Sequence, residues 1–165
     1  GKQEIESKPH TLTLHINEQI EILKVDAAKK EIELIQKTDI VHDYLYCDSL
    51  RVYQIMLNLI NNAIKYTKSG GKIIYDVKEL ESEREGYAKI RFSVKDTGIG
   101  MTKEFVENVF DAFAREKSST ESGIEGTGLG LGIAQQIVNA HDGLITVQSS
   151  IKKGTSFNVY LPIDF

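Results

Sequence analysis

The sequence contains a single cysteine, Cys47, which excludes an internal disulfide and a metal centre built from several cysteines. It also lacks the roughly 18–20 consecutive apolar residues that a membrane-spanning helix needs, and we expect no signal peptide. No block of lysine and arginine stands out and the net charge is −4, so a nucleic-acid partner is not expected. Any anionic ligand must therefore be held by local features of the chain.

Several common catalytic patterns are also missing. The sequence has no Gly-x-Ser-x-Gly motif, no Cys/His pair typical of nucleophilic catalysis, and neither the His-Arg-Asp nor the Asp-Phe-Gly motif of protein kinases. Its histidines show no metal-ligand spacing; they are His10, His15, His42 and His141.

The length of 165 residues and the hydrophobic content of 41% suit one compact domain. Periodic apolar residues predict helices at 17–29, 48–67 and 129–139, with Asn17 and Asp48 as N-caps, and a short helix at 102–110. β-Branched and alternating runs predict strands at 11–14, 31–37, 40–47, 72–80, 87–96, 144–149 and 155–161, with a turn at 38–39. These elements predict an α+β fold: a two-layer sandwich whose mixed, mostly antiparallel sheet is covered on one face by about three helices.

The predicted helix 48–67 carries an unusual polar face. Gln54, Asn58, Asn62 and Lys65 lie on one stripe, which offers amide oxygens for a hard cation and an ammonium group for phosphate. A solvated surface face is the alternative, although asparagine is a poor helix former. The predicted apolar stripe of the same helix consists of Leu50, Tyr53, Leu57, Ile60 and Ile64.

Strand 87–96 alternates cleanly, and the alternation directs Asp96 toward the apolar side. A carboxylate there is costly unless it is paired, and a buried aspartate can accept a hydrogen bond from the exocyclic amine of adenine. Gly98 and Gly100 would let the backbone pass close to a base or adopt a positive φ. A plain strand-to-loop turn is the alternative.

A second glycine cluster precedes the predicted helix 129–139. Backbone N–H groups exposed by glycines, together with a helix N-terminus, form an anion site suited to phosphates. The cluster matches neither of the common phosphate-binding fingerprints, and a flexible linker is the alternative. The glycines are Gly126, Gly128, Gly130 and Gly132, and Leu129, Leu131 and Ile133 lie between or beside them.

Before this cluster, Phe110 and Phe113 stand three residues apart and are followed by Arg115. The two aromatic rings could anchor a mobile loop at 115–126, with the arginine available for phosphate. The simpler interpretation is a pair of core aromatics beside a surface arginine.

In their order, residues 58–67, 96–100, 110–115 and 126–132 resemble the N, G1, F and G2 boxes of the histidine-kinase catalytic domain, a member of the GHKL superfamily with the Bergerat fold. The resemblance spans about residues 12–162. It implies ATP and Mg²⁺ as ligands, with residues 12–165 forming the ATP-binding catalytic domain and residues 1–11 an N-terminal remnant or linker.

The resemblance also implies roles for individual residues. Asn62 would be the Mg²⁺ ligand, Asn58 its neighbour near metal and phosphates, and Lys65 a phosphate contact. Tyr66 would pack on adenine or ribose, and Asp96 would accept from the adenine amine. Residues 111–125 would form a lid over the ATP. The remaining nucleotide-binding candidates are Gly98 and Gly100 along the base, Phe110, Phe113 and Arg115 at the lid, and Gly126, Thr127, Gly128, Leu129 and Gly130 around the triphosphate.

Two departures from the family pattern stand out. Gly132 takes a place where the family often has serine or alanine, and the phosphoacceptor segment of the family is missing. We therefore expect a piece of a longer kinase, with its dimerisation and phosphoacceptor histidine domain upstream and a response-regulator receiver as a further partner. The isolated domain should be monomeric and the whole kinase homodimeric. The implied location is cytoplasmic, and membrane-anchored sensors are among the parents that the family includes.

Three other functions compete with this interpretation. Hydrolysing GHKL ATPases carry a glutamate one turn before the metal-binding asparagine, where this chain has Asn58, which cannot remove a proton. A serine kinase of the anti-sigma type is opposed by the segment 110–115. A degenerate interaction module that binds no nucleotide is opposed by the presence of Asn62, Asp96 and both glycine clusters.

Overall fold

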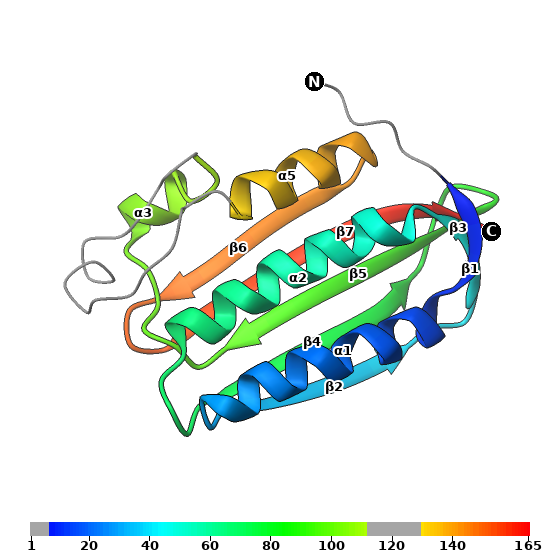
Figure 1. Cartoon of the computed structure of the whole chain (residues 1–165). Coiled ribbons are helices and arrows are strands. Elements are labelled where there is room, and N and C mark those ends of the chain that lie inside the picture. The colour runs from blue at the N-terminus through cyan, green and yellow to red at the C-terminus, as the bar shows by residue number, and fades with distance from the viewer. Residues whose placement is uncertain (1–6, 112–129) are drawn as a thin grey trace.

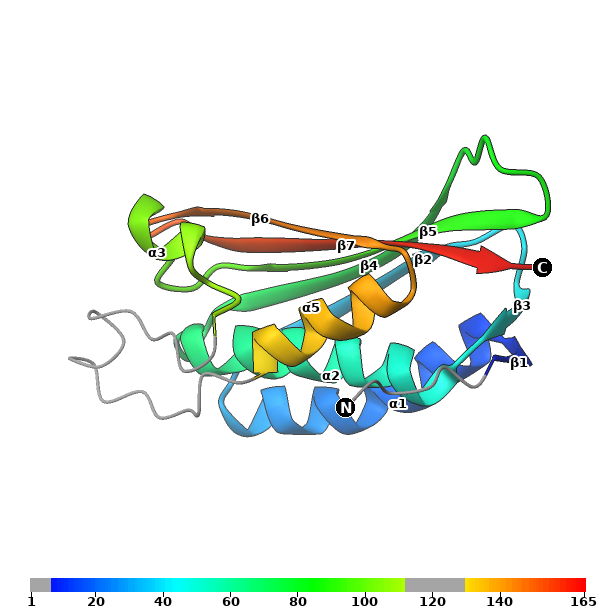
Figure 2. The same ribbon diagram turned by 90° about the horizontal axis from the view of Figure 1, so that it is seen from above.

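The computed structural model describes residues 7–111 and 130–165. In these residues seven strands form one sheet in the order β1-β3-β7-β5-β4-β2, and β6 pairs with β7. The helices α1 (Leu12–Lys29), α2 (Ser49–Tyr66) and α5 (Gly130–Ala140) cover one face of this sheet (Figures 1 and 2). The short helix α3 (Lys103–Glu107) precedes α5 in the sequence. The strands are β1 (Lys8–Thr11), β2 (Glu33–Asp39), β3 (Tyr44–Cys47), β4 (Lys72–Leu80), β5 (Tyr87–Asp96), β6 (Leu144–Ser150) and β7 (Gly154–Asp164).

This arrangement confirms the predicted α+β two-layer sandwich. All strand pairs are antiparallel except β2 with β4, which run parallel. The core lies between the sheet and the helices. It is lined by the inward residues of β5 and β7, where Val94 faces Phe157 and Phe92 faces Val159 in the register.

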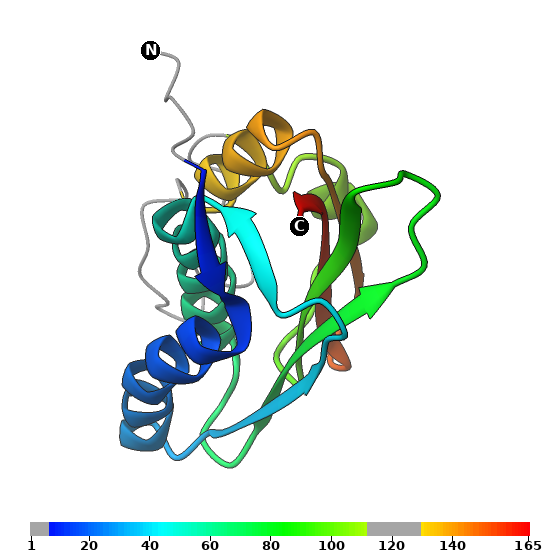
Figure 3. The ribbon, with the colours of Figure 1, turned by 90° about the vertical axis from the view of Figure 1, so that its right-hand side faces the viewer.

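The predicted turn at 38–39 is wrong, because β2 continues to Asp39 and the next strand, β3, begins only at Tyr44. β2 pairs with β4, and β3 pairs instead with β1 and meets β7 at Tyr46 opposite Asp164. The connection between them is held by Glu79 of β4, whose Oε1 accepts hydrogen bonds from the N–H groups of Val41 (3.2 Å) and His42 (2.7 Å). This contact directs the chain away from β2. Figure 3 shows β1 and β3 at the end of the molecule where the C-terminus lies.

The start of α1 also differs from the prediction. The helix begins at Leu12, whereas the sequence predicts a strand at 11–14 and a helix capped by Asn17. Asp43 provides the missing cap: its carbonyl oxygen accepts from Leu12 N–H (2.8 Å), and its Oδ1 accepts from the N–H (2.8 Å) and the hydroxyl (2.6 Å) of Thr13. Orphan N–H groups of a first helical turn need such acceptors, and here a distant residue supplies them.

Helix α2 begins as predicted, because Asp48 accepts a hydrogen bond from the backbone N–H of Arg51 (3.2 Å). Its predicted apolar stripe is misplaced. Leu50 is 67% exposed, Ile60 alone of the stripe is fully buried, and Tyr53, Leu57 and Ile64 lie at the margin of the core. The buried face is instead made of Val52, Ile55, Met56, Leu59, Ile60 and Ala63.

Among the described residues, no helix combines the length and the apolar character that crossing a membrane requires.

Candidate functional site

The C-terminal end of α2, the end of β5 and the first residue of α5 lie at the same end of the molecule (Figure 1). Two backbone hydrogen bonds fix the segment that follows β5. Ile99 N–H donates to the carbonyl oxygen of Tyr66 at the end of α2 (3.1 Å), and Thr97 N–H donates to that of Lys72 at the start of β4 (3.1 Å). The predicted N and G1 boxes therefore adjoin one another, although about thirty positions separate them in sequence.

Asp96 is the buried carboxylate of this region, with 5% of its surface exposed. Its Oδ1 accepts hydrogen bonds from the N–H groups of Gly98 (2.8 Å) and Thr155 (3.2 Å). Burial raises the pKa of the carboxyl group, and the two N–H donors offset only part of this effect. Within the described residues Oδ2 has no hydrogen bond and the carboxylate no ion-pair partner. Among the described residues, Oδ2 of Asp96 is therefore free to accept a hydrogen bond.

Glycines are required around this carboxylate. A β-carbon at Gly98 would lie 2.4 Å from the carbonyl oxygen of Tyr66, so a side chain there would push the loop away from α2. Gly100 has φ +73°, and a β-carbon there would lie 1.9 Å from the carbonyl oxygen of Ser150. Gly98 and Gly100 are therefore required by the close approach of neighbouring backbone. Their role in lining a base is a proposal.

Sequence reasoning missed the residues of β6 and β7 that support Asp96. The hydroxyl of Ser149 accepts from Met101 N–H (2.8 Å) and contacts the hydroxyl of Thr155 (2.8 Å). Thr155 in turn donates its N–H to Asp96. These bonds connect residues 96, 101, 149 and 155, which no local spacing relates. The sheet register, with β7 beside both β5 and β6, is the signal that reveals them.

The polar stripe of α2 faces the beginning of α5. A β-carbon built on Gly130 would lie 3.8 Å from Cβ, Cγ and Oδ1 of Asn58. The amide nitrogen of Asn58 is buried and has no hydrogen-bond partner in the described part of the chain. Asn62 is half-buried and Lys65 is exposed. Gln54 is engaged differently, because its Oε1 accepts from a guanidinium N–H of Arg51 (3.2 Å).

Other predicted site residues have more limited support. Tyr66 is half-buried at the end of α2, and Phe110 packs edge-on against Phe157 with ring centroids 6.2 Å apart. Gly132 lies in the first turn of α5, where a β-carbon would be 3.0 Å from the carbonyl oxygen of Phe110. The predicted positions Phe113, Arg115, Gly126, Thr127, Gly128 and Leu129, and the predicted loop 115–126, lie outside the described residues.

The donor set fits Mg²⁺ only in a particular way. Over residues 7–111 and 130–165, no group of three His, Cys, Asp or Glu side chains could hold a metal. Mg²⁺ usually keeps several waters and shares the phosphates of a bound nucleotide, so neutral amide oxygens can complete its shell. The amide oxygens of Asn62 and Asn58 suit this arrangement. The buried amide nitrogen of Asn58, which has no partner among the described residues, is a donor suited to a phosphate oxygen and not to the metal.

Comparison with known proteins agrees with this geometry. The family model described as histidine kinase-, DNA gyrase B-, and HSP90-like ATPase matches residues 47–164, and the chain belongs to this family. Its fold and relatives assign it, within the family, to the ATP-binding catalytic domains of histidine kinases. The resemblance stated from the sequence is thereby confirmed.

Sensor protein SrrB of Staphylococcus aureus is 35% identical over 159 residues, which cover 90% of this chain and 26% of SrrB. The chain thus spans about a quarter of the length of the curated relatives that it matches. Among solved structures, full-length ShkA in complex with AMPPNP has a TM-score of 0.81 and 26% identity, covering 99% of this chain and 32% of ShkA. The catalytic domain of histidine kinase ThkA has a TM-score of 0.77 and 28% identity, covering 95% of both chains.

Proposed function

We propose that this domain binds ATP together with Mg²⁺ and donates the γ-phosphate to a histidine on a separate dimerisation domain of a sensor histidine kinase. The observation that carries the proposal is the buried carboxylate of Asp96, whose Oδ2 has no partner among the described residues. The exocyclic amine of adenine would donate to this oxygen. Discrimination against a base with a carbonyl there would follow, because two acceptors would then face each other.

The rest of the nucleotide would extend from Asp96 toward α2 and α5. Gly98 and Gly100 would line the base, and Tyr66 would pack on adenine or ribose. Lys65 would supply positive charge to the phosphates, and the N-terminus of α5 at Gly130 would add backbone donors. The residues outside the described ranges that would contribute are Phe113 and Arg115 at the lid, and Gly126, Thr127, Gly128 and Leu129 around the triphosphate, with Phe110 at the lid base.

Mg²⁺, held by Asn62 with Asn58 nearby, would offset negative charge on the phosphates. In the reaction, an imidazole nitrogen of the acceptor histidine forms a bond to the γ-phosphorus while the bond to the bridging β-phosphate oxygen breaks, and ADP leaves. The contribution of this domain is positioning and electrostatic stabilisation. Asn58 offers no base for activating water, which favours transfer over hydrolysis.

The partners follow from this chemistry. The acceptor histidine would belong to a dimerisation domain of the same kinase, and the phosphoryl group would pass on to an aspartate of a response regulator. Both partners are proposals, because the chain covers only about a quarter of its curated relatives.

The test is calorimetric titration of the domain with AMPPNP, with and without Mg²⁺. We expect binding that strengthens when Mg²⁺ is present and weakens at least tenfold in Asn62→Ala. A second step adds ATP and a dimerisation domain that carries the phosphoacceptor histidine, and measures acid-labile phosphohistidine. Absence of binding at millimolar nucleotide would contradict the proposal, and binding with rapid hydrolysis but no transfer would favour an ATPase instead.

A further inference from the structure

Two histidines that the nucleotide site does not use meet where the chain enters the domain. His10 lies on β1 and His15 on the second turn of α1. Nδ1 of His10 and Nε2 of His15 are 3.0 Å apart, and the rings are nearly perpendicular, at 85°. The contact joins two elements that meet at a sharp change of direction, and both side chains are half-buried.

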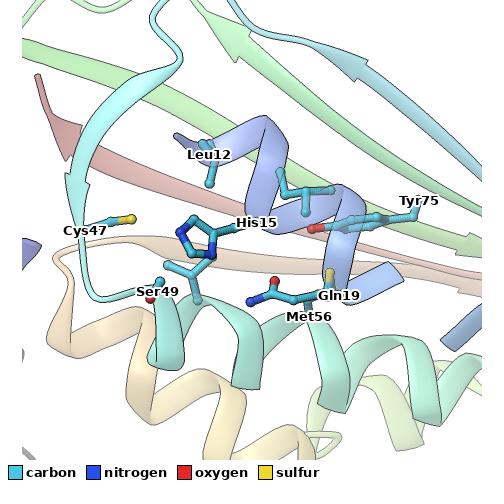
Figure 4. A pocket seen from close by; sticks show the side chains of 9 residues that line it. Leu12, His15, Gln19, Cys47, Ser49, Met56 and Tyr75 are labelled. Atoms are coloured by element: carbon cyan, nitrogen blue, oxygen red, sulfur yellow. The ribbon is translucent and has the colours of Figure 1, made fainter. Parts of the chain in front are cut away.

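The surroundings of His15 leave room beside this pair. A small cavity lies between α1, α2, β3 and β4. Figure 4 shows His15 among Cys47, Ser49 and Gln19, with the hydroxyl of Tyr75 pointing toward the same space. That hydroxyl is buried and has no partner in the described part of the chain. His15 lines this cavity and His10 does not, so the cavity lies on one side of the histidine pair.

The electrostatic setting favours the neutral form of His10. Burial lowers the pKa of His10, and the neighbouring His15 and Lys8 lower it further, whereas Asp48 acts in the opposite direction. At neutral pH the His10 imidazole is therefore neutral, with a nitrogen lone pair available. Burial raises the pKa of Cys47 to about 11, so its thiol stays protonated and is not expected to act as a third ligand.

The separation of the two nitrogens matches a shared metal ion. With metal–nitrogen bonds of about 2.0–2.1 Å, two nitrogens on one ion are roughly 2.9 Å apart at a right angle and roughly 3.4 Å apart in a tetrahedron. The observed 3.0 Å lies between these values. Without an ion, the two nitrogens share a hydrogen bond at this distance, which a bound ion would replace.

We propose that His10 and His15 form a two-histidine site for a divalent transition-metal ion such as Zn²⁺, at the junction of β1 and α1. Because the described residues contain no group of three potential His, Cys, Asp or Glu ligands, water molecules complete the coordination shell. The bound ion clips the first strand to the first helix. The site is independent of the nucleotide site, and Mg²⁺, which prefers oxygen ligands, does not occupy it.

The experiment is titration of the whole chain with ZnCl₂ in a non-chelating buffer, followed by calorimetry and by thermal unfolding. We expect one ion per chain with micromolar affinity, and a rise in Tm that EDTA reverses. His10→Gln and His15→Gln should each weaken the affinity at least tenfold. The matched control is His141→Gln. Within the described residues, the side chain of His141 has one hydrogen bond, through Nδ1 to the carbonyl oxygen of Ile137, and it directly follows α5.

Imidazole nitrogen NMR of the unmutated chain provides a second readout that does not depend on how the variants fold. Zn²⁺ should shift the ring resonances of His10 and His15 and leave those of His42 and His141 in place. No binding at 100-fold molar excess, equal affinity in His15→Gln, or shifts confined to His42, which pairs with Glu79, would each overturn the proposal. AMPPNP affinity should be the same with and without Zn²⁺, which separates this test from that of the nucleotide site.

Discussion

A β-carbon at position 154 would lie 2.0 Å from the carbonyl oxygen of Asp96, so Gly154 and Asp96 fit together only because residue 154 has no side chain. Gly154 begins β7 and has φ +112°, a value that side-chain-bearing residues rarely adopt. The next residue, Thr155, donates its N–H to the carboxylate of Asp96. The position of the acid that we assign to adenine therefore depends on a glycine 58 positions later in the chain.

Gly154→Ala should destabilise the domain by about 3 kcal/mol or more, because the strained backbone conformation adds to a steric overlap that backbone atoms cannot relieve. It should also weaken AMPPNP binding, since Thr155 and Asp96 must move apart. Urea denaturation and calorimetry measure the two effects. The control is Gly86→Ala, where φ is +80° but no atom lies within 4 Å of the added carbon; a loss of only about 1 kcal/mol is expected there. Equal losses in the two variants would contradict the argument.

Asp96→Asn should separate the stability of the site from its binding function. Burial raises the pKa of Asp96 in the folded protein above its value in the unfolded chain. Between these two pKa values the folded protein binds the proton more tightly than the unfolded chain does. The free energy of unfolding therefore falls as pH rises from the unfolded to the folded pKa. Asparagine does not titrate, so the variant Asp96→Asn does not lose stability in this way. The variant should therefore gain stability relative to the unmutated chain as pH rises from about 4 toward neutrality.

The same variant should lose AMPPNP binding at least tenfold, because an amide N–H would face the donor amine of adenine. Asp96→Ala, in comparison, should be less stable at every pH, since the N–H groups of Gly98 and Thr155 lose their acceptor. Urea denaturation from pH 4 to pH 8 tests both statements. A variant Asp96→Asn that binds nucleotide normally would refute the assignment of the carboxylate.

Ser149→Ala should cost about 1–2 kcal/mol, because the N–H of Met101 would lose its acceptor and the hydroxyl of Thr155 its neighbour. Amide exchange at Met101 should accelerate, which a general loss of packing would not single out. Ser150→Ala is the control, as this side chain is exposed and has no hydrogen bond in the described part of the chain. If both variants behave alike, the bond to Met101 contributes nothing to the loop.

Asp48→Ala should lower the free energy of unfolding by about 1 kcal/mol through loss of the N-cap of α2, and Asp48→Asn should restore most of it. Thermal and urea unfolding of the three proteins measure this. Nucleotide affinity should not change, because the cap lies at the opposite end of α2 from Asn62. A decrease in affinity with unchanged stability would show that this separation is false.

The elements that the sequence predicted well carry their signals locally. β4 and β5 match their predicted bounds of 72–80 and 87–96, because the alternation of each strand continues over its whole length. Helix α2 matches because Asp48 caps it from within three residues of Arg51. The misplaced elements depend on distant residues. α1 begins five residues earlier than its predicted cap Asn17 because Asp43 supplies the acceptors, and β2 continues past the predicted turn at 38–39 because it pairs with β4 up to Asp39.

The same distinction applies to the candidate site. The alternation of β5 predicted that Asp96 is buried, and the structure confirms its burial. The alternation contained no information on Thr155, which lies 59 positions away and reaches Asp96 only because β7 is the neighbour of β5. Ser149 was missed for the same reason: its bond to Met101 spans 48 positions.

The place of β7 has a consequence for how the domain is made. It comes after every other strand in sequence, yet it lies between β3 and β5 and also carries β6. While the chain emerges from a ribosome, β3 and β5 therefore have no shared partner until residues 154–164 are free. Until then β5 has an unpaired edge, and its apolar face and the helices remain only partly packed. The complete sheet can therefore form only in a late step, after β7 has been synthesised.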